Sequence, residues 1–298
     1  MASMAPPSTA RIAFLTTATM VAFAANSVLN RLALAEGDID AVTYTGARLL
    51  SGALMLGLIL VLRGRPPRRG ALAGSPAGAL ALFGYAIAFS LAYIALGAGT
   101  GALILFASVQ IGMLGWAIHR GERPGAPEWA GFLIATGFLA ALLAPGLTAP
   151  DPLGAFLMVL AGLSWAAYTL LGRGSSTPLA DTAGNFLRCL PVAVVLLVPG
   201  LAWYGATPAG WAYAIASGAI ASGLGYAIWY SVLPALSRTT AAYVQLTVPA
   251  IAAAGGVLFI AEPLTLRLVV CAAGILGGVA LALRAAEARK ARAAPAPR

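Results

Sequence analysis

The sequence contains few charged residues and few side chains that bind metals or carry out catalysis. Of its 298 residues only 9% are charged, against about 25% in ordinary soluble domains. It has a single histidine, His119, and its two cysteines, Cys189 and Cys271, lie inside apolar runs, which excludes a disulfide framework and a metal-ligand spacing. Because no nucleophile, metal cluster or buried acid–base pair is visible, we expect no cofactor and no enzyme activity.

Carboxylates are absent from the middle of every apolar run. The nine acidic residues fall in connecting segments, in the C-terminal segment or at the end of a run. Carriers that couple transport to protons or sodium commonly use carboxylates inside the membrane, so the sequence does not support carboxylate-based coupling. Lysine is also nearly absent, Lys290 being the only one. Sites for phosphorylated anions need fixed basic groups, which disfavours nucleotides and sugar phosphates as substrates.

Apolar residues, by contrast, make up 60% of the chain. They come in runs long enough to cross a bilayer, which takes about 20 residues, and the runs lack the alternation of barrel strands. We therefore predict an all-α integral membrane protein with ten transmembrane helices. The predicted spans are 12–33, 41–62, 74–96, 100–119, 127–147, 153–172, 182–204, 209–233, 239–260 and 266–285. The first resembles a secretory signal, but Asn26, Asn30 and Arg31 interrupt it, so we expect it to be retained.

Basic residues gather at alternate ends of these spans. Fourteen of the 18 lie on one side of the predicted topology, and short loops rich in Lys and Arg mark the cytoplasmic face. We therefore expect a bacterial inner (plasma) membrane protein with residues 1–11 and the basic tail 286–298 in the cytoplasm. Topology explains the net charge of +9 better than nucleic-acid binding does. The expected partners are a small-molecule substrate and membrane lipid, and we expect the protein to act as a monomer.

The chain contains its own sequence twice. Three pairs of residues are separated by 140 positions: Arg48 and Arg188, Glu122 and Glu262, Gly137 and Gly277. At a spacing of 142, Arg31 matches Arg173. Each copy, 12–147 and 153–285, holds five predicted spans. Because five is odd, the second copy must enter the membrane from the opposite side, which predicts an inverted repeat of the kind that builds secondary transporters.

Short motifs give these halves a family resemblance. The fourth span of each half closes with Gly121-Glu122-Arg123-Pro124 or Ala261-Glu262-Pro263-Leu264, and the fifth spans bear glycines, as in Trp129-Ala130-Gly131 and Gly277-Gly278. With these features the chain resembles the drug/metabolite transporter superfamily, in particular its EamA-type exporters, and is most similar to aromatic amino-acid exporters of the YddG kind. Cys271 stands where the first half has Gly131, a departure from the pattern. The resemblance implies ten spans, inverted halves and export of amino acids or drugs.

Aromatic and polar residues at matched positions predict a binding cavity. Tyr85 and Phe89 are four apart and share a helix face, and at a spacing of 141 they match Tyr226 and Tyr230. Phe23 lies opposite Trp165 at a spacing of 142. The candidate substrate-binding residues are Asn26, Tyr85, Phe89, Phe106, Gln110, Trp165, Tyr168, Tyr226, Tyr230, Tyr243 and Thr247. Gln245 falls off the face of Tyr243 and Thr247. Packing between helices and anchoring at the membrane interface are the alternative roles of such aromatics.

Two arginines and two glutamates are the charged candidates. Arg48 and Arg188 lie about 10 Å deep from opposite faces. Snorkelling or the binding of a neighbouring helix end is one interpretation, a symmetric gate is a second and binding of a substrate carboxylate is a third. Glu122 and Glu262 are expected to accept hydrogen bonds at the N-terminus of the span that follows each of them.

These residues describe a cavity with aromatic walls, hydroxyls and amides, and without net charge at its centre. Such walls suit a hydrophobic amino acid or a flat organic cation. We predict an exporter of aromatic or hydrophobic amino acids that works by alternating access. It is driven by the substrate gradient, or its coupling uses something other than a buried acid. An organic-cation or multidrug exporter of the same fold is the alternative within the class. A channel or lipid scramblase is the alternative from another class.

Overall fold

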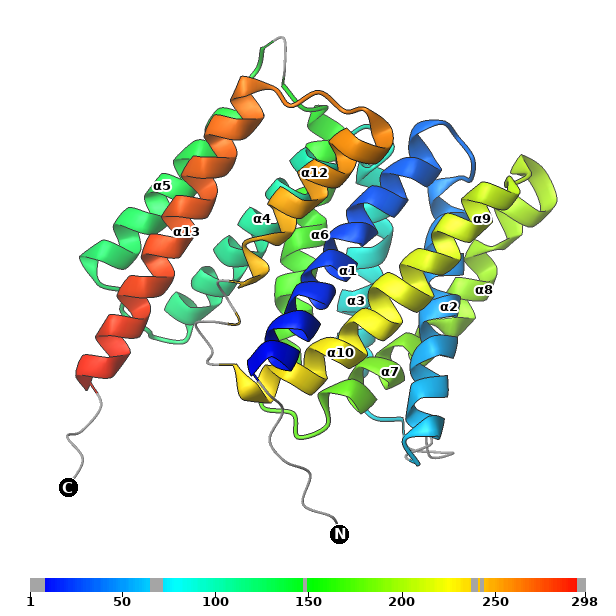
Figure 1. Cartoon of the computed structure of the whole chain (residues 1–298), viewed down its shortest axis with the longest axis horizontal. Helices are drawn as coiled ribbons and strands as arrows, with labels where there is room; N and C mark the ends of the chain where they lie inside the picture. The colour runs from blue at the N-terminus through cyan, green and yellow to red at the C-terminus, as the bar shows by residue number, and fades with distance from the viewer. Residues whose placement is uncertain (1–8, 65–71, 147–148, 237–240, 242–243, 294–298) are drawn as a thin grey trace.

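A computed structural model shows a bundle of helices (Figure 1). The structure describes residues 9–64, 72–146, 149–236, 241 and 244–293. The helices of the first half are α1 (Thr9–Ala35), α2 (Ala41–Leu62), α3 (Pro76–Ala92), α4 (Ala98–His119) and α5 (Ala126–Leu143). Those of the second half are α6 (Pro152–Leu171), α7 (Pro178–Arg188), α8 (Leu190–Leu196), η1 (Gly200–Tyr204), α9 (Pro208–Ile215), η2 (Ala216–Leu224), α10 (Gly225–Val232), η3 (Leu233–Ala235), α12 (Val248–Ile260) and α13 (Leu266–Ala293).

Many of these helices can cross a membrane. Within the described residues seven helical stretches are long and apolar enough, and eight are if the bent pair α7 and α8 forms one span. Two shorter apolar helices, α3 and α12, have 17 and 13 residues. The prediction of an all-α, multi-pass membrane protein is confirmed. The predicted span 239–260 begins in a part of the chain outside the described residues, so the count of ten stays a prediction.

Polar residues in the connecting segments fix where several helices begin. The Asp40 carboxylate accepts hydrogen bonds from the first N–H groups of α2, and the Asp151 carboxylate accepts one from Gly154 at 2.6 Å. Such caps satisfy N–H groups that have no partner inside the helix. Proline occupies the first turn of α3, α6, α7 and α9, where its missing N–H costs nothing.

The seventh predicted span differs most from the structure. The sequence predicts one continuous helix over 182–204, but α7 begins at Pro178, ends at Arg188 and meets the next helical stretch at 46°. Pro191 explains the break, because proline removes a backbone donor and its ring clashes with the carbonyl four residues earlier. The last predicted span also differs, since α13 continues from the membrane segment into the basic tail as far as Ala293.

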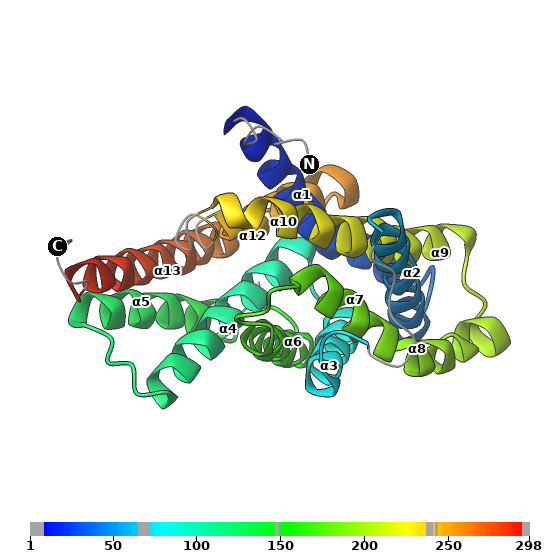
Figure 2. The same cartoon turned by 90° about the horizontal axis from the view of Figure 1, so that it is seen from below.

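Helices from the two halves interlock. From the second half, α6 packs on α3 and α4; from the first half, α1 packs on α10 and α12. Figures 1 and 2 show α5 and α13 paired at one margin of the bundle, beside α4. On the other side of the bundle α2 packs along the π-helical stretch η2. The core between these layers buries Tyr44, Phe89 and Tyr93 almost completely.

The bundle has two ends, which we name after their glutamates. The Glu262 end comprises the connections 36–40, 93–97, 205–207 and 261–265. The Glu122 end comprises 72–75, 120–125, 172–177 and 233–236. Helix α1 begins and α13 ends at the Glu122 end (Figure 1).

Candidate functional site

A small cavity of about 40 Å³ lies where helices of both halves meet. Six helices or segments contribute to its wall. The lining residues are Phe23, Asn26, Ser27, Tyr85, Phe89, Leu105, Phe106, Trp165, Tyr226 and Gln245. Its volume holds only a few water molecules, so a substrate needs the walls to move apart.

Trp165 of α6 is the centre of the aromatic wall. Its ring lies 4.8 Å from that of Tyr85 and stacks on Tyr168 at 5.2 Å and on Tyr226 at 5.8 Å. Phe23 of α1 holds the matching position in the first half, with its ring 5.6 Å from Tyr226. These distances are those of favourable aromatic pairs. Phe23 and Trp165, which the repeat aligns, therefore both contact Tyr226 at the cavity.

Asn26 joins the cavity wall to the neighbouring helix. Its side-chain oxygen accepts hydrogen bonds from Ser217 Oγ at 2.8 Å and from Ser222 Oγ at 3.3 Å, both in η2. Asn26 is 4% exposed, and a polar group so deeply buried needs partners. The π-helical backbone of η2, a form that occurs frequently at functional sites, presents both serines to α1.

A chain of hydroxyl groups leads from the aromatic wall towards the Glu122 end. Tyr168 Oη donates to Thr182 Oγ1 at 3.0 Å, and Thr182 Oγ1 donates to Tyr230 Oη at 3.2 Å. The chain links α6, α7 and α10. Tyr168 and Tyr230 are thus next to the cavity, beside Trp165 and Tyr226, but do not line it.

Arg48 does not snorkel towards the membrane interface. It is 2% exposed, its Nη2 donates to Tyr85 Oη at 3.0 Å, and its guanidinium carbon lies 5.1 Å from the ring centroids of both Tyr85 and Phe89. Its Nη1 has no hydrogen-bond partner, and in the described part of the chain it forms no ion pair. The expectation of walls without charge therefore needs correction, because a cation lies directly behind two wall residues.

Arg188, the sequence match of Arg48, has different surroundings. It is half-buried and donates to the carbonyl oxygens of Ala73 at 2.5 Å and Leu72 at 2.8 Å, just before α3 begins. One interpretation of the sequence is that it binds the carbonyl end of a neighbouring helix; it binds carbonyls of the segment that precedes α3 instead. The symmetry of the two arginines in the sequence is thus not a symmetry of their contacts.

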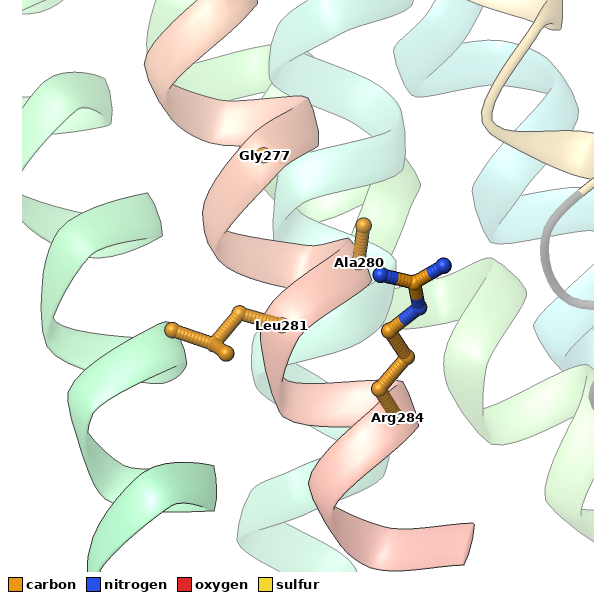
Figure 3. A pocket seen from close by; sticks show the side chains of 4 residues that line it. All are labelled: Gly277, Ala280, Leu281 and Arg284. Carbon is orange, nitrogen blue, oxygen red and sulfur yellow. The ribbon is translucent and has the colours of Figure 1, made fainter.

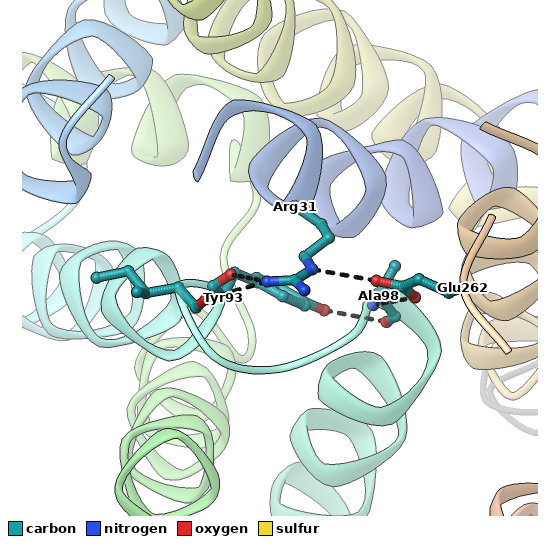
Figure 4. A network of polar contacts seen from close by, with 5 residues as sticks. Arg31, Tyr93, Ala98 and Glu262 are labelled. Carbon is teal, nitrogen blue, oxygen red and sulfur yellow. Dashed lines mark hydrogen bonds and ion pairs between the residues drawn. The ribbon is translucent and has the colours of Figure 1, made fainter. Parts of the chain in front are cut away.

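Glu262 joins the two halves at one end of the bundle. It forms an ion pair with Arg31 at 3.2 Å and accepts the N–H of Ala98, the first residue of α4, at 2.8 Å. Arg31 also donates to the carbonyls of Tyr93 and Ile94 at the end of α3 (Figure 4). We expected Glu262 to bind the start of the following span, α13; it binds the start of α4 instead, with its carboxylate beside Gly97.

Glu122, at the opposite end of the bundle, forms a longer ion pair than Glu262 does. It lies 3.7 Å from Arg289 of α13, whose Nε donates to Glu128 at 2.6 Å. The start of the following span, α5, is capped by Glu128 and not, as expected, by Glu122. Hydrogen bonding to Glu128 raises the pKa of Arg289 above its usual value.

Not all predicted site residues reach the cavity. Asn26, Tyr85, Phe89, Phe106, Trp165 and Tyr226 line it. Gln110 is only half-buried and lies outside the lining, and Thr247 is exposed, its hydroxyl donating to its own helix turn at Val244. Tyr243 lies outside the described residues.

Four lining residues were not among the predicted site residues: Phe23, Ser27, Leu105 and Gln245. Phe23 was recognisable from its match with Trp165, and Ser27 from its place one helical turn after Phe23. Gln245, placed off the cavity face by helical spacing, lies in the wall.

A larger hollow of about 490 Å³ lies on the surface of α13, lined by Gly277, Ala280, Leu281 and Arg284 (Figure 3). One helix supplies all four residues, and only Arg284 is polar. Because polar groups that converge from several helices are typical of substrate sites, the aromatic cavity is the better candidate.

Comparisons with known proteins identify the family. Residues 152–284 match the EamA-like transporter family. The chain is 53% identical over 287 residues to uncharacterized protein PA1977 of Pseudomonas aeruginosa, covering 95% of this chain and 98% of that protein. A crystal structure described only as that of a protein matches with a TM-score of 0.60 and 19% identity, over 89% of this chain and 97% of that one, which shows a shared fold. By this match, residues 152–284 belong to the EamA-like transporter family.

Proposed function

We propose that the protein exports amino acids with aromatic or hydrophobic side chains, as exporters of the YddG kind do. The observation that carries this proposal is the cavity between the halves, walled by Tyr85, Phe89, Trp165 and Tyr226. Flat rings offer apolar area with a defined stacking geometry. A substrate with a ring or a branched apolar side chain fits between them when the walls separate.

Alternating access is supported by the packing of the helices. If the halves are inverted repeats, α1 corresponds to α6, α3 to the α9–α10 stretch and α4 to α12. The contacts of α6 with α3 and α4 then correspond to those of α1 with α10 and α12. The ring pairs Trp165–Tyr85 and Phe23–Tyr226 correspond in the same way. Secondary transporters built on such repeats rock one part against another around a central site.

The energy source we propose is the substrate's own gradient. Acidic side chains of the described residues lie in connections or near helix ends, and Glu128, the most buried, is engaged by Arg289. We place the protein in the bacterial inner membrane as a monomer, with the Glu122 end in the cytoplasm, because the basic residues gather there.

The main alternative is export of organic cations. Arg48 argues against it, since a buried guanidinium beside the cavity repels a positively charged substrate. A channel or lipid scramblase would keep the fold but transport with little saturation or stereospecificity.

Counterflow into liposomes tests the proposal. Purified protein is reconstituted, loaded with unlabelled tryptophan and given labelled tryptophan outside, with phenylalanine, tyrosine and leucine as competitors and a cationic dye as the rival substrate. We expect saturable uptake that Trp165→Ala reduces. Trp203→Ala is the matched control, because Trp203 is 74% exposed and lies far from the lining residues in sequence. Flux that ignores all amino acids would refute the substrate class, and strong dependence on a pH gradient would refute gradient-driven transport.

A further inference from the structure

We infer that Arg48 and Tyr85 form the part of the cavity that recognises a carboxylate, so that the substrates are organic acids with an apolar or aromatic body. The inference rests on the proposed transport function and names the charged group of the substrate that the site binds. It starts from Arg48, a cation that is 2% exposed and forms no ion pair within the described residues.

The hydrogen bonds of Arg48 leave two donors free beside the cavity. Its Nη1 has no partner. Its Nη2 donates to Tyr85 Oη, and because that oxygen accepts this bond, the Tyr85 hydroxyl keeps its own hydrogen for another acceptor. A carboxylate has two oxygens and takes charge-assisted hydrogen bonds from such a pair of donors.

Arg48 is also held in place for this role. Its guanidinium lies over the rings of Tyr85 and Phe89, both of which line the cavity. Its carbonyl oxygen faces Gly218 of η2, where a Cβ atom would lie only 2.1 Å from it. A buried cation without a counter-charge is unfavourable, and an anionic ligand group supplies that charge whenever the substrate is bound.

Two indole compounds separate the carboxylate from the amine. Indole-3-propionate keeps the carboxylate and lacks the amine, whereas tryptamine keeps the amine and lacks the carboxylate. In the wild-type protein we expect indole-3-propionate to inhibit tryptophan counterflow, and to stabilise the protein against heat, at concentrations at least about tenfold lower than tryptamine, the ratio that a charge-assisted hydrogen bond produces. Arg48→Gln should abolish this preference, Arg48→Lys should keep it, and Tyr85→Phe should reduce it in a protein that keeps its ring packing.

Arg188→Gln is the matched control, because Arg188 donates to the carbonyls of Leu72 and Ala73 and does not contact the cavity. It should leave the preference for the carboxylate unchanged. An unchanged preference in both Arg48→Gln and Tyr85→Phe would overturn the inference. Lack of amino-acid flux in the wild-type protein would instead count against the proposed function, and the heat-stability measurement distinguishes the two.

A separate observation concerns the ion pair at the Glu262 end. We infer that the Arg31–Glu262 ion pair holds the Glu262 end closed. We infer further that Arg173 and Glu122 form the equivalent ion pair at the other end when the molecule opens at the Glu262 end. We call these two ion pairs the locks. The repeat pairs Arg31 with Arg173 and Glu262 with Glu122. Only the first pair is joined here; among the described residues Arg173 and Glu122 form no ion pair with each other.

The backbone around the two glutamates supports the match. Each glutamate follows a residue in the left-handed conformation, Ala261 with a φ of 55° and Gly121 with a φ of 83°. In both turns the N–H of the glutamate donates back to the preceding helix, to the carbonyl of Ala117 five residues before Glu122 and to that of Gly256 six residues before Glu262. The second carboxylate is therefore presented by a similar left-handed turn, although the two hydrogen bonds differ by one residue.

The joined lock shows which parts it holds together. Arg31 of α1 binds the carbonyl end of α3 and Glu262, and Glu262 binds the start of α4. Moving the ends of α1 and α12 away from the 93–97 turn breaks the bonds to Tyr93, Ile94 and Ala98. Moving α1 away from α12 breaks the ion pair itself. The matched lock would join the end of α6 to the Glu122 turn, where Arg173 is exposed.

Paired cysteines test the locks without relying on transport. The native cysteines are first removed by Cys189→Ala and Cys271→Ala. One variant then carries Arg31→Cys with Glu262→Cys, and the other carries Arg173→Cys with Glu122→Cys. Each is oxidised, and the thiols that no longer react with a maleimide are counted. We expect both pairs to cross-link and tryptophan to change their rates in opposite directions. Failure of the second pair to cross-link, while the first does, would overturn the inference. The same holds if both rates rise or fall together.

Discussion

The two ends of the bundle have matched sequences and different contacts. At the Glu262 end, Arg31, Glu262 and the start of α4 are joined in one network. At the Glu122 end, Arg173 is exposed and, among the described residues, Glu122 forms an ion pair only with Arg289, at 3.7 Å. In the proposed alternating-access cycle the molecule is open to one side at a time, so the matched residues of the two ends are not joined together. The difference between the ends is the one that this proposal requires.

The largest effect should come from the contact between α2 and η2. A Cβ at Gly218 would lie 2.1 Å from the Arg48 carbonyl oxygen, so Gly218→Ala must push the two helices apart. Such overpacking costs about 1–3 kcal/mol, and we expect a lower apparent melting temperature in detergent. Gly57→Ala, in α2 with open space around it, should raise that temperature, because alanine is the better helix former by about 0.5–1 kcal/mol. Equal responses would contradict the close contact.

Truncation of the two glutamates compares the ends directly. Glu262→Ala removes the ion pair to Arg31 and the partner of the Ala98 N–H, which should cost about 1–3 kcal/mol. Glu122→Ala removes only an exposed contact, worth less than about 1 kcal/mol. Thermal unfolding of both variants measures the difference. A larger loss for Glu122→Ala would mean that the stable state in solution is closed at the Glu122 end.

Ala261→Gly makes the two glutamate turns alike. Ala261 is in the left-handed conformation, which costs a residue with a side chain about 1–2 kcal/mol, whereas its match Gly121 pays no such cost. We expect a somewhat higher melting temperature. The gain is reduced because glycine has more conformational freedom than alanine in the unfolded chain. Gly121→Ala should have the opposite sign. A fall in stability for both variants would contradict the match between the turns.

The smallest effect should come from Arg289. The Arg289 side chain is 36% exposed, and the buried Glu128 carboxylate keeps the N–H of Gly125 as a donor, so Arg289→Ala should change stability by about 1 kcal/mol or less, and less at high salt. The pKa of Arg289 is raised in the folded state. Its contribution to folding stability is therefore complete below the pKa of the unfolded state and is lost only as the pH rises through the pKa of the folded state. Melting curves near neutral pH should therefore show no pH dependence from this group.

Helical spacing and the repeat placed Tyr85, Phe89, Trp165 and Tyr226 on one surface, and these residues line the cavity. Their role in substrate binding stays a prediction. The same spacing also selected Gln110 and Thr247, which are not in the lining. For Thr247 the spacing assumes a regular helix, but α12 begins only at Val248. For Gln110, spacing within α4 does not show how far along the helix the cavity extends.

The sequence by itself determined that this is a helical membrane protein, since the length of its apolar runs is a local property that needs no knowledge of the fold. The two inverted halves remain a prediction from residue spacing. Only the tertiary structure decided that Arg48 is buried beside the cavity while Arg188 is not, and that Glu262 is joined to Arg31. Both results depend on contacts between segments more than 30 residues apart in the chain, as in Arg48 with Tyr85 and Arg31 with Glu262. Residue spacing gives matched positions the same prediction, whereas the folded chain gives each of them its own neighbours.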